Sequence, residues 1–185
     1  MASEFDLARA AYCPSQIKYL FVAEAPPSLG SGRFFYFPDV RTGDSLFLEM
    51  MKVLYPDYCS CAADIRPRKA ELLERFKREG YYLIDSVDQP LKDPRPMVKR
   101  RDIQTCLPTL IQKIHACCQE GTGVILISAT VYEVCVAPLL AAGIRILNTE
   151  SIDFPGSGGQ RKFREKLGKL MQRAGYVPPA AGVCA

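Results

Sequence analysis

A glutamate on a proline-rich turn is the first residue in the sequence whose type and setting could support chemistry. Glu24 follows the apolar run 18–23 and precedes Ala25, Pro26 and Pro27. Each proline fixes its backbone φ angle, so this turn has little conformational freedom. A carboxylate held at the end of a strand can orient a water molecule or stabilise a positively charged sugar. The alternative is a solvated loop glutamate beside a turn.

Four consecutive aromatic residues follow in the same loop. The run Phe34-Phe35-Tyr36-Phe37 fits neither helical nor strand periodicity. A nucleobase requires a flat partner, and stacking on an aromatic ring is worth roughly 1–3 kcal/mol per base. We therefore expect at least one of these rings to face a base, while the others belong to the core.

A second carboxylate, Asp85, directly follows the apolar run Tyr81-Tyr82-Leu83-Ile84. A carboxylate that is buried at such a point requires a polar or charged partner. It could recognise the edge of a base. The alternative is that Asp85 caps a helix or a turn.

A glycine-rich loop opens the last helical pattern and is followed at once by basic residues. Backbone N–H groups at the start of a helix attract phosphate, and nearby cations neutralise a nucleic-acid backbone. The alternative is a flexible connection before an ordinary amphipathic helix. The candidate contacts to a nucleic acid in this loop are Gly156, Ser157, Gly158, Gly159, Gln160, Arg161 and Lys162. A second basic stretch, 92–101, could also touch DNA or form a solvated loop.

Strands and helices alternate along the chain. Gly, Pro or polar residues bound four short apolar runs that predict buried parallel strands, at 18–23, Tyr81–Asp85, 124–128 and 144–147. Amphipathic or apolar helical patterns, most of them ending at a glycine, lie between these runs at Ser45–Leu54, 69–79, 102–119, 131–142 and 161–174.

This order predicts an α/β fold in a single domain over residues 1–185. We expect a central, mostly parallel, four-stranded sheet with helices on both faces, and loose termini at about 1–12 and 177–185. In such sheets the ligand site lies at the carboxyl ends of the strands. The loops after the first two strands and the glycine-rich loop are therefore expected to meet there.

Composition narrows the class of protein. The net charge of +4 is compatible with a nucleic-acid partner, and no apolar run reaches the ~18 residues that would span a bilayer. The start of the chain lacks the pattern of a secretory signal, so we expect a cytoplasmic protein, associated with the nucleoid if it is bacterial. The eight cysteines and the one histidine lack metal-ligand spacing, which predicts buried thiols and no metal.

These segments, taken in order, resemble the uracil-DNA glycosylase superfamily. Residues 23–27, Ala-Glu-Ala-Pro-Pro, resemble the first motif of its iron–sulfur branch. Phe34-Phe35-Tyr36 with Asp44-Ser45-Leu46-Phe47 is similar to the aromatic and Asn-x-Phe-Trp motifs of the mismatch and hypoxanthine branches. Residues 80–87 resemble the strand that carries a base-reading Asn or Asp, and 154–163 occupy the place of the second motif.

The resemblance implies a monomeric DNA glycosylase that flips a deaminated base (uracil, hypoxanthine or xanthine) into a pocket and hydrolyses its glycosidic bond. Glu24 would orient the water, and Asp85 would read the base edge. Phe35, or else Phe34 or Tyr36, would stack on the base. The other implied contacts are Ala23, Ala25 and Asp44 to the base and Pro26 to DNA, beside the glycine-rich loop.

Two departures from the family pattern shape this expectation. The usual histidine of the second motif is absent, so Ser157, Gln160 or loop N–H groups would stabilise the leaving base. Only Cys13 precedes the first motif, so we expect no iron–sulfur cluster and no other cofactor. Two alternatives stay open: a catalytically inactive module that binds DNA or a partner, and a small enzyme that processes nucleotides.

Overall fold

Three short, fully buried strands form the centre of the structure, which is a computed structural model describing residues 3–56, 62–93, 95–156 and 158–176. Strands β1 (Tyr19–Ala23), β2 (Tyr81–Asp85) and β3 (Gly123–Leu126) form a parallel sheet in the order β2-β1-β3. In register, Ala23 of β1 pairs with Asp85 of β2. Every strand residue is buried, as parallel strands covered on both faces require. The predicted α/β class is confirmed.

The predicted fourth strand, 144–147, is reduced to a single parallel bridge between Ile146 and Val124. The cause is Asn148, whose side chain contacts the end of β3. The side-chain amide of Asn148 accepts from Leu126 N at 2.7 Å and donates to Leu126 O at 3.0 Å. Because this side chain satisfies the backbone groups that a longer strand would pair, the ladder stops after one bridge.

The predicted helices are present; α2 has the predicted bounds, and the other four have shifted ends. Their bounds are α2 (Ser45–Leu54), α4 (Lys69–Arg78), α5 (Pro96–Cys117), α6 (Ala129–Ala141) and α7 (Gln160–Arg173). Helix α5 begins six residues before the predicted start, at a proline, which is favourable in the first turn. A short helix α3 (Ala62–Ile65) and the 3-10 turn η2 (Arg66–Arg68) precede α4.

The expectation of a loose N-terminus is wrong, because residues 4–11 form helix α1 (Glu4–Ala11). Ser3 caps the helix by accepting from Asp6 N, and the Asp6 carboxylate accepts from Ser3 N in return. The Phe5 side chain is buried, with its ring 4.8 Å from that of Phe34. Packing of this ring and the hydrogen bond from Arg9 to Asp85 hold the helix on the body of the protein. The other predicted loose end, 177–185, lies outside the described residues.

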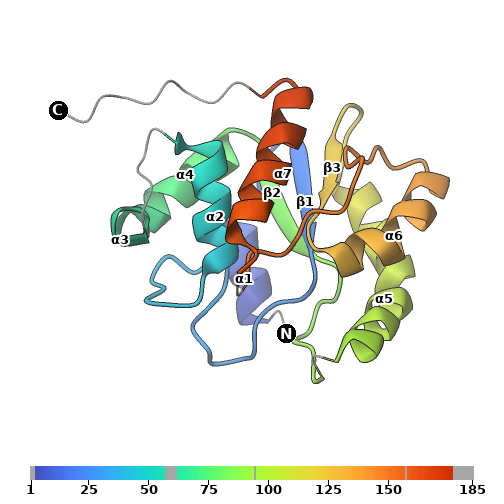
Figure 1. Cartoon of the computed structure of the whole chain (residues 1–185), viewed down its shortest axis with the longest axis horizontal. Helices are drawn as coiled ribbons and strands as arrows, with labels where there is room; N and C mark the ends of the chain where they lie inside the picture. The colour runs from blue at the N-terminus through green and yellow to red at the C-terminus, as the bar shows by residue number, and fades with distance from the viewer. Residues whose placement is uncertain (1–2, 57–61, 94, 157, 177–185) are drawn as a thin grey trace.

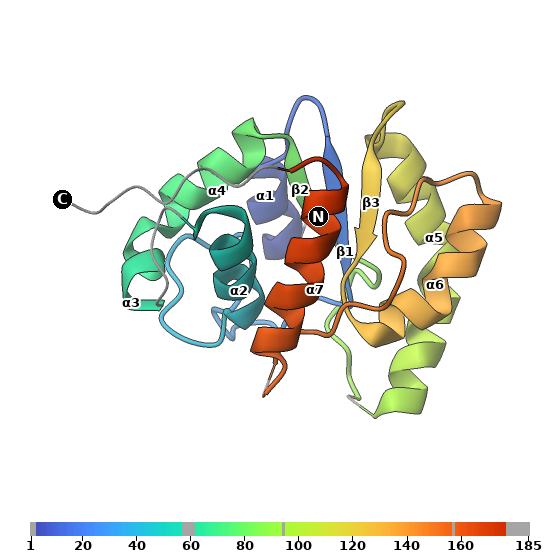
Figure 2. The same ribbon diagram turned by 45° about the horizontal axis from the view of Figure 1, so that its top comes forward.

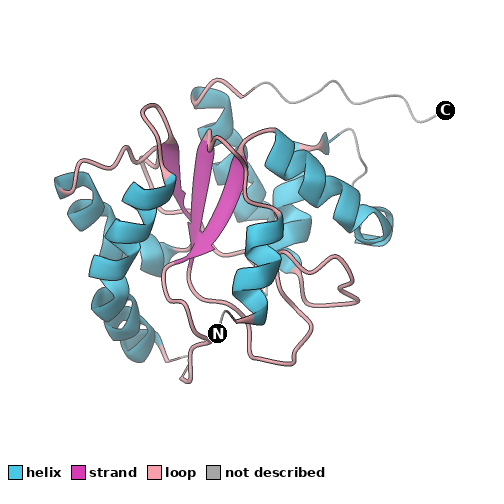
Figure 3. Cartoon of the chain, turned by 180° about the vertical axis from the view of Figure 1, so that it is seen from behind, coloured by secondary structure: helices cyan, strands magenta, loops and turns pink. Residues whose placement is uncertain are grey.

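Helices cover both faces of the sheet. Figure 1 shows α7 crossing in front of the strands with α2 beside it, and α5 with α6 on the right. The tilted view of Figure 2 shows the same grouping. Seen from behind in Figure 3, α1 and α5 lie on the opposite face, and the strands point toward the long loops. Nearly all of the buried apolar side chains form one continuous cluster. None of the described helices combines the length and apolar character needed to cross a membrane.

Candidate functional site

A cavity of about 210 Å³ lies where β1 and β2 end. Its apolar wall includes residues that the sequence singled out, namely Ala23, Ala25, Pro26, Phe34 and Phe35. The wall also includes apolar residues that were not among the predicted site residues, namely Pro27, Leu46, Phe47, Leu83 and Phe154. Ala23 and Ala25 both line the cavity because alternate residues of an extended segment face the same side. The cavity therefore lies at the carboxyl ends of the strands, where the rule for parallel sheets predicts a ligand site.

The aromatic run divides between cavity and core. Phe34 and Phe35 line the cavity, and the ring of Phe35 lies 5.3 Å from that of Phe47. Tyr36 is not among the lining residues: its hydroxyl accepts from Leu83 N at 2.7 Å and is 3.1 Å from Leu83 O. Burial raises the pKa of this hydroxyl far above its usual range, so it stays protonated and able to donate. Tyr36 therefore anchors the loop to β2, while Phe34 and Phe35 present flat apolar surfaces.

Asp85 lies at the end of β2, lines the cavity and is buried. Arg9 of α1 donates to its Oδ2 at 2.8 Å, while Oδ1 has no hydrogen-bond partner among the described residues. Burial raises the pKa of Asp85 to about 6, and the Arg9 guanidinium acts in the opposite direction. At pH 7 Asp85 is therefore mostly an ionised carboxylate, a group that accepts hydrogen bonds and donates none.

Asp44 is the second acid that lines the cavity, at the start of α2. Arg66 donates to its Oδ1 through Nε at 3.0 Å and Nη2 at 2.8 Å. Its Oδ2 is buried without a hydrogen bond and lies 3.7 Å from the ammonium of Lys69. Lys69 is itself buried, and burial lowers its pKa to about 8. Asp44, which lines the cavity, therefore pairs with two cations, Arg66 and Lys69.

Glu24 does not line the cavity, although both of its neighbours in sequence do. Its Oε1 accepts from Ser128 Oγ at 2.7 Å, and its Oε2 accepts from the Lys99 ammonium at 2.7 Å. Each carboxylate oxygen can accept a further hydrogen bond, so a water molecule could still bind there. The structure places Glu24 beside the cavity, held between α5 and the start of α6.

Ser128, which the sequence analysis missed, is held in a strained conformation at the end of the third strand. Its φ of 86° and ψ of 142° fall in a region that residues other than glycine rarely adopt. Its hydroxyl donates to Glu24 and also accepts from Val131 N at 3.3 Å, capping α6. Strain of this kind persists only where the surrounding contacts impose it, and here the two hydrogen bonds of the hydroxyl hold Ser128 beside Glu24.

The strain at Ser128 leads to a prediction about stability. Ser128→Gly relieves the strain, whereas Ser128→Ala retains it, and both remove the same hydroxyl. The glycine variant should therefore be more stable than the alanine variant by about 1–2 kcal/mol, the cost of one strained residue. Urea unfolding of the two proteins at pH 7 measures this difference. An alanine variant as stable as the glycine variant would contradict the strain.

The glycine-rich loop reaches the cavity through Phe154, which lines it and is 42% exposed. Gly159 is required here, because an added Cβ would lie 2.6 Å from Phe154 O. Arg161 and Lys162 are exposed at the start of α7, and no acidic residue lies in its first turn. Ser157 lies outside the described residues, while Gly156, Gly158 and Gln160 form the loop and the helix start without a contact to the cavity.

Most cations of the stretch 92–101 are already paired. Arg95 pairs with Asp93, Lys99 with Glu24 and Arg100 with Glu133. Surface pairs of this kind are weak and can open to bind phosphate. The pairing of Lys99 differs, because its partner Glu24 is the residue for which the sequence predicts a catalytic role.

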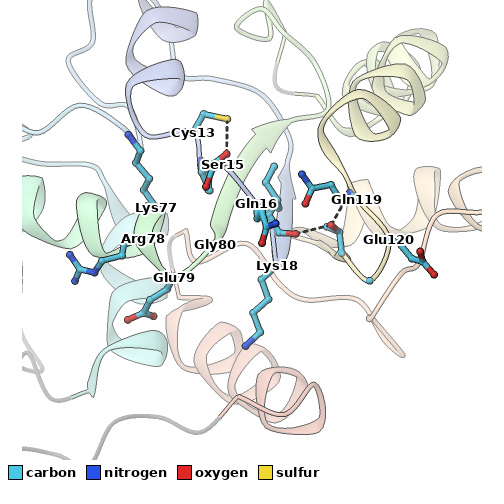
Figure 4. Close-up of a pocket in the computed structure, with 14 residues that line it drawn as sticks. Cys13, Ser15, Gln16, Lys18, Lys77, Arg78, Glu79, Gly80, Gln119 and Glu120 are labelled. Carbon is cyan, nitrogen blue, oxygen red and sulfur yellow. Dashed lines mark hydrogen bonds between the residues drawn. The ribbon is translucent and has the colours of Figure 1, made fainter.

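A larger hollow, of about 910 Å³, lies at the opposite, amino end of the strands. Figure 4 shows that its three cationic side chains, Lys18, Lys77 and Arg78, point in different directions. Lys77 is engaged with the backbone, donating to Ala11 O at 2.9 Å. Since no charged groups converge there, this hollow is a weaker site than the cavity around Asp85.

No protein-family model and no curated protein matches this chain. Within the described residues, no three His, Cys, Asp or Glu side chains come together in a way that could hold a metal ion. The cavity at the ends of β1 and β2 combines aromatic side chains with two buried carboxylates, Asp44 and Asp85.

Proposed function

We propose that the cavity binds a nucleobase flipped out of DNA and that the protein is a DNA glycosylase for a deaminated base. The observation that supports this proposal is that Phe34, Phe35 and Asp85 line one small cavity at the carboxyl end of the sheet. Flat apolar walls suit the faces of a base, and an ionised carboxylate suits an N–H on its edge. Uracil, hypoxanthine and xanthine all present such an N–H.

Glu24 is the candidate catalytic residue of this reaction. With the base in the cavity, the sugar would lie at its mouth, beside the segment of Glu24. The carboxylate would accept a proton from water as the water oxygen bonds to the sugar carbon and the glycosidic bond breaks; the base would leave with the bonding electron pair as an anion and take up a proton from solvent. It would also stabilise the positive charge that develops on the sugar. Ser128 fixes Oε1, so the orientation of the carboxylate is set before substrate binds.

A second candidate function is binding of a damaged base without excision. The specific observation that favours it is the ion pair between Lys99 and Glu24, which occupies the carboxylate at 2.7 Å. If this pair persists in the complex, Glu24 is a poor base for water. The protein would then act as a reader of damaged DNA on the same fold.

The deciding experiment is excision from labelled oligonucleotides. Uracil, hypoxanthine and xanthine are each placed in single- and double-stranded DNA, and alkaline cleavage reveals abasic sites. The Glu24→Gln protein, purified identically, controls for contaminating host glycosylase. Cleavage by the wild type alone supports excision. Salt-dependent binding of the same oligonucleotides without cleavage supports the reader, and neither result on any substrate rejects both functions.

Replacing Asp85 by Asn tests the carboxylate as the base-reading group. Arg9 would hold the amide oxygen, so the amide NH₂ would face the base N–H, donor against donor. We expect kcat/KM at pH 7.5 to fall by about 10–100-fold, the effect of one mispaired edge. Below pH 6 the wild-type carboxyl is itself protonated and the two proteins should converge. A pH-independent ratio of the two kcat/KM values would refute this role.

A further inference from the structure

Arg9 connects the N-terminal helix to the edge of the cavity. It lies on α1, and its side chain is 11% exposed. Nη1 lies 3.2 Å from Asp6 Oδ1, and Nη2 donates to Asp85 Oδ2 at 2.8 Å. Asp6 is in turn fixed by the capping box with Ser3. A chain of charge-assisted hydrogen bonds therefore runs from the start of α1 to the end of β2.

Arg9 also lies behind the aromatic wall. Its Cζ is 5.5 Å from the centroid of the Phe34 ring, on which Phe5 packs from the same helix. Phe34 and Asp85 both line the cavity, whereas Arg9 does not. Arg9 therefore contacts two parts of the cavity lining from outside the cavity: the Phe34 ring and the Asp85 carboxylate.

We propose that Arg9 is a positioning residue for base recognition: it holds Oδ2 of Asp85 and supports the Phe34 ring, so that Oδ1 is presented to the N–H of a flipped base. This inference rests on the proposed function for its ligand. The contact geometry gives each oxygen of Asp85 a separate task. Oδ2 is bound to the protein, and Oδ1, which has no partner among the described residues, is left for the ligand.

Other charged groups around Asp85 do not replace Arg9. Lys113 of α5 donates to the main-chain oxygen of Asp85 at 3.0 Å and to the Asp88 carboxylate at 2.6 Å. Asp88 raises the pKa of Asp85, and Tyr36 is a neutral neighbour. Arg9 is the strongest influence that opposes burial, so its loss raises the pKa of Asp85 above about 6.

Three variants of the full chain test the proposal. Arg9→Met removes the positive charge but keeps a side chain of similar length. Arg9→Lys keeps a positive charge but lacks the planar guanidinium group. Arg145→Met is the matched control, an exposed arginine at the amino end of the sheet that donates to Gly121 O. The readouts are the pH dependence of kcat/KM for excision and the pH titration of the Asp85 carboxyl carbon by ¹³C NMR, assigned with Asp85→Asn. The second readout requires no activity.

Arg9→Met is expected to move both the carboxyl titration and the acid limb of kcat/KM to higher pH. The loss of kcat/KM at pH 7 should be about tenfold, since a neighbouring arginine typically lowers a carboxyl pKa by about 1–3. Arg9→Lys should recover most of both effects, and Arg145→Met should show neither. In the Asp85→Asn background, Arg9→Met should leave the acid limb unchanged, because the group that it controls is absent.

A folded Arg9→Met protein whose Asp85 titrates as in the wild type would overturn the proposal. So would an Arg9→Lys protein that titrates as Arg9→Met does. Failure of the glycosylase function gives a different result. In that case the wild type excises no base, yet Arg9→Met still moves the Asp85 titration, which supports the pairing and rejects the reaction.

Discussion

Glu24→Gln is expected to lower the single-turnover rate constant for base excision by about 10²–10⁴-fold, the contribution typical of a general base. The substitution keeps the size and one oxygen of the side chain. Ser128 Oγ can still donate to that oxygen, as it does to Oε1 at 2.7 Å. What disappears is the negative charge that would accept a proton from water and stabilise the sugar. DNA affinity should change little, because the base contacts come from the cavity.

The matched control for this variant is Glu133→Gln. Glu133 lies on α6, is exposed and pairs with Arg100, so it presents the same change of charge outside the cavity. Its excision rate should equal that of the wild type. If Glu24→Gln also excises at the wild-type rate, Glu24 is not catalytic. Its contacts with Ser128 and Lys99 would then serve only to join α5 and α6 to the sheet.

The sequence predicted the location of the cavity because local patterns fix the ends of strands. The runs before Glu24 and Asp85 are apolar, and Ala23 pairs with Asp85 in the parallel register. Two strands that run side by side must deliver the residues at their ends to one place. Ala23, Ala25 and Asp85 therefore meet at the cavity, as predicted.

The partners of those residues could not be predicted in the same way. Arg9 is 76 positions from Asp85, Lys99 is 75 from Glu24, and Ser128 is 104 from Glu24. Which side chains meet over such separations depends on the rotation and height of each helix on the sheet, which periodicity does not specify. The strain at Ser128 is also invisible in the sequence, because serine is an ordinary residue before a helix.

Two local signals in the sequence bear on the start of α1 and on the fourth strand. Ser3 and Asp6 have the spacing of a capping box, which predicts the start of α1 despite its short length. Asn148, directly after the run 144–147, marks the point where a side chain replaces a strand. At both places hydrogen bonds from polar side chains, which apolar periodicity does not reveal, decide the local structure.

Asp44→Ala should cause the largest loss of stability among the variants considered, about 3–5 kcal/mol at pH 7. Removal of the carboxylate leaves the buried ammonium of Lys69 without its counter-charge and Arg66 without its acceptor. Lys69 retains only the Phe34 carbonyl at 3.2 Å and the face of the Phe47 ring at 4.4 Å. Urea unfolding measures the loss, and Glu133→Ala, at an exposed ion pair, should cost less than about 1 kcal/mol.

The pH dependence separates the charge from simple loss of volume. Burial lowers the pKa of Lys69 to about 8, below its unfolded value of about 10.4. Between these values the unfolded chain binds more protons, so this group makes the wild type more stable as pH rises. Asp44 raises the pKa of Lys69, so without it the lysine loses its proton at a lower pH. The cost of Asp44→Ala should therefore be smaller at pH 9.5 than at pH 6.

A double variant decides whether the pair serves stability or the site. If the cost of Asp44→Ala is the uncompensated ammonium, Asp44→Ala with Lys69→Met should recover most of it, because apolar side chains often replace buried ion pairs without loss. Additive effects of the two substitutions would contradict that account. A recovered fold combined with impaired base binding would then assign Asp44 to the cavity that it lines, and the buried lysine to the task of holding that carboxylate in place.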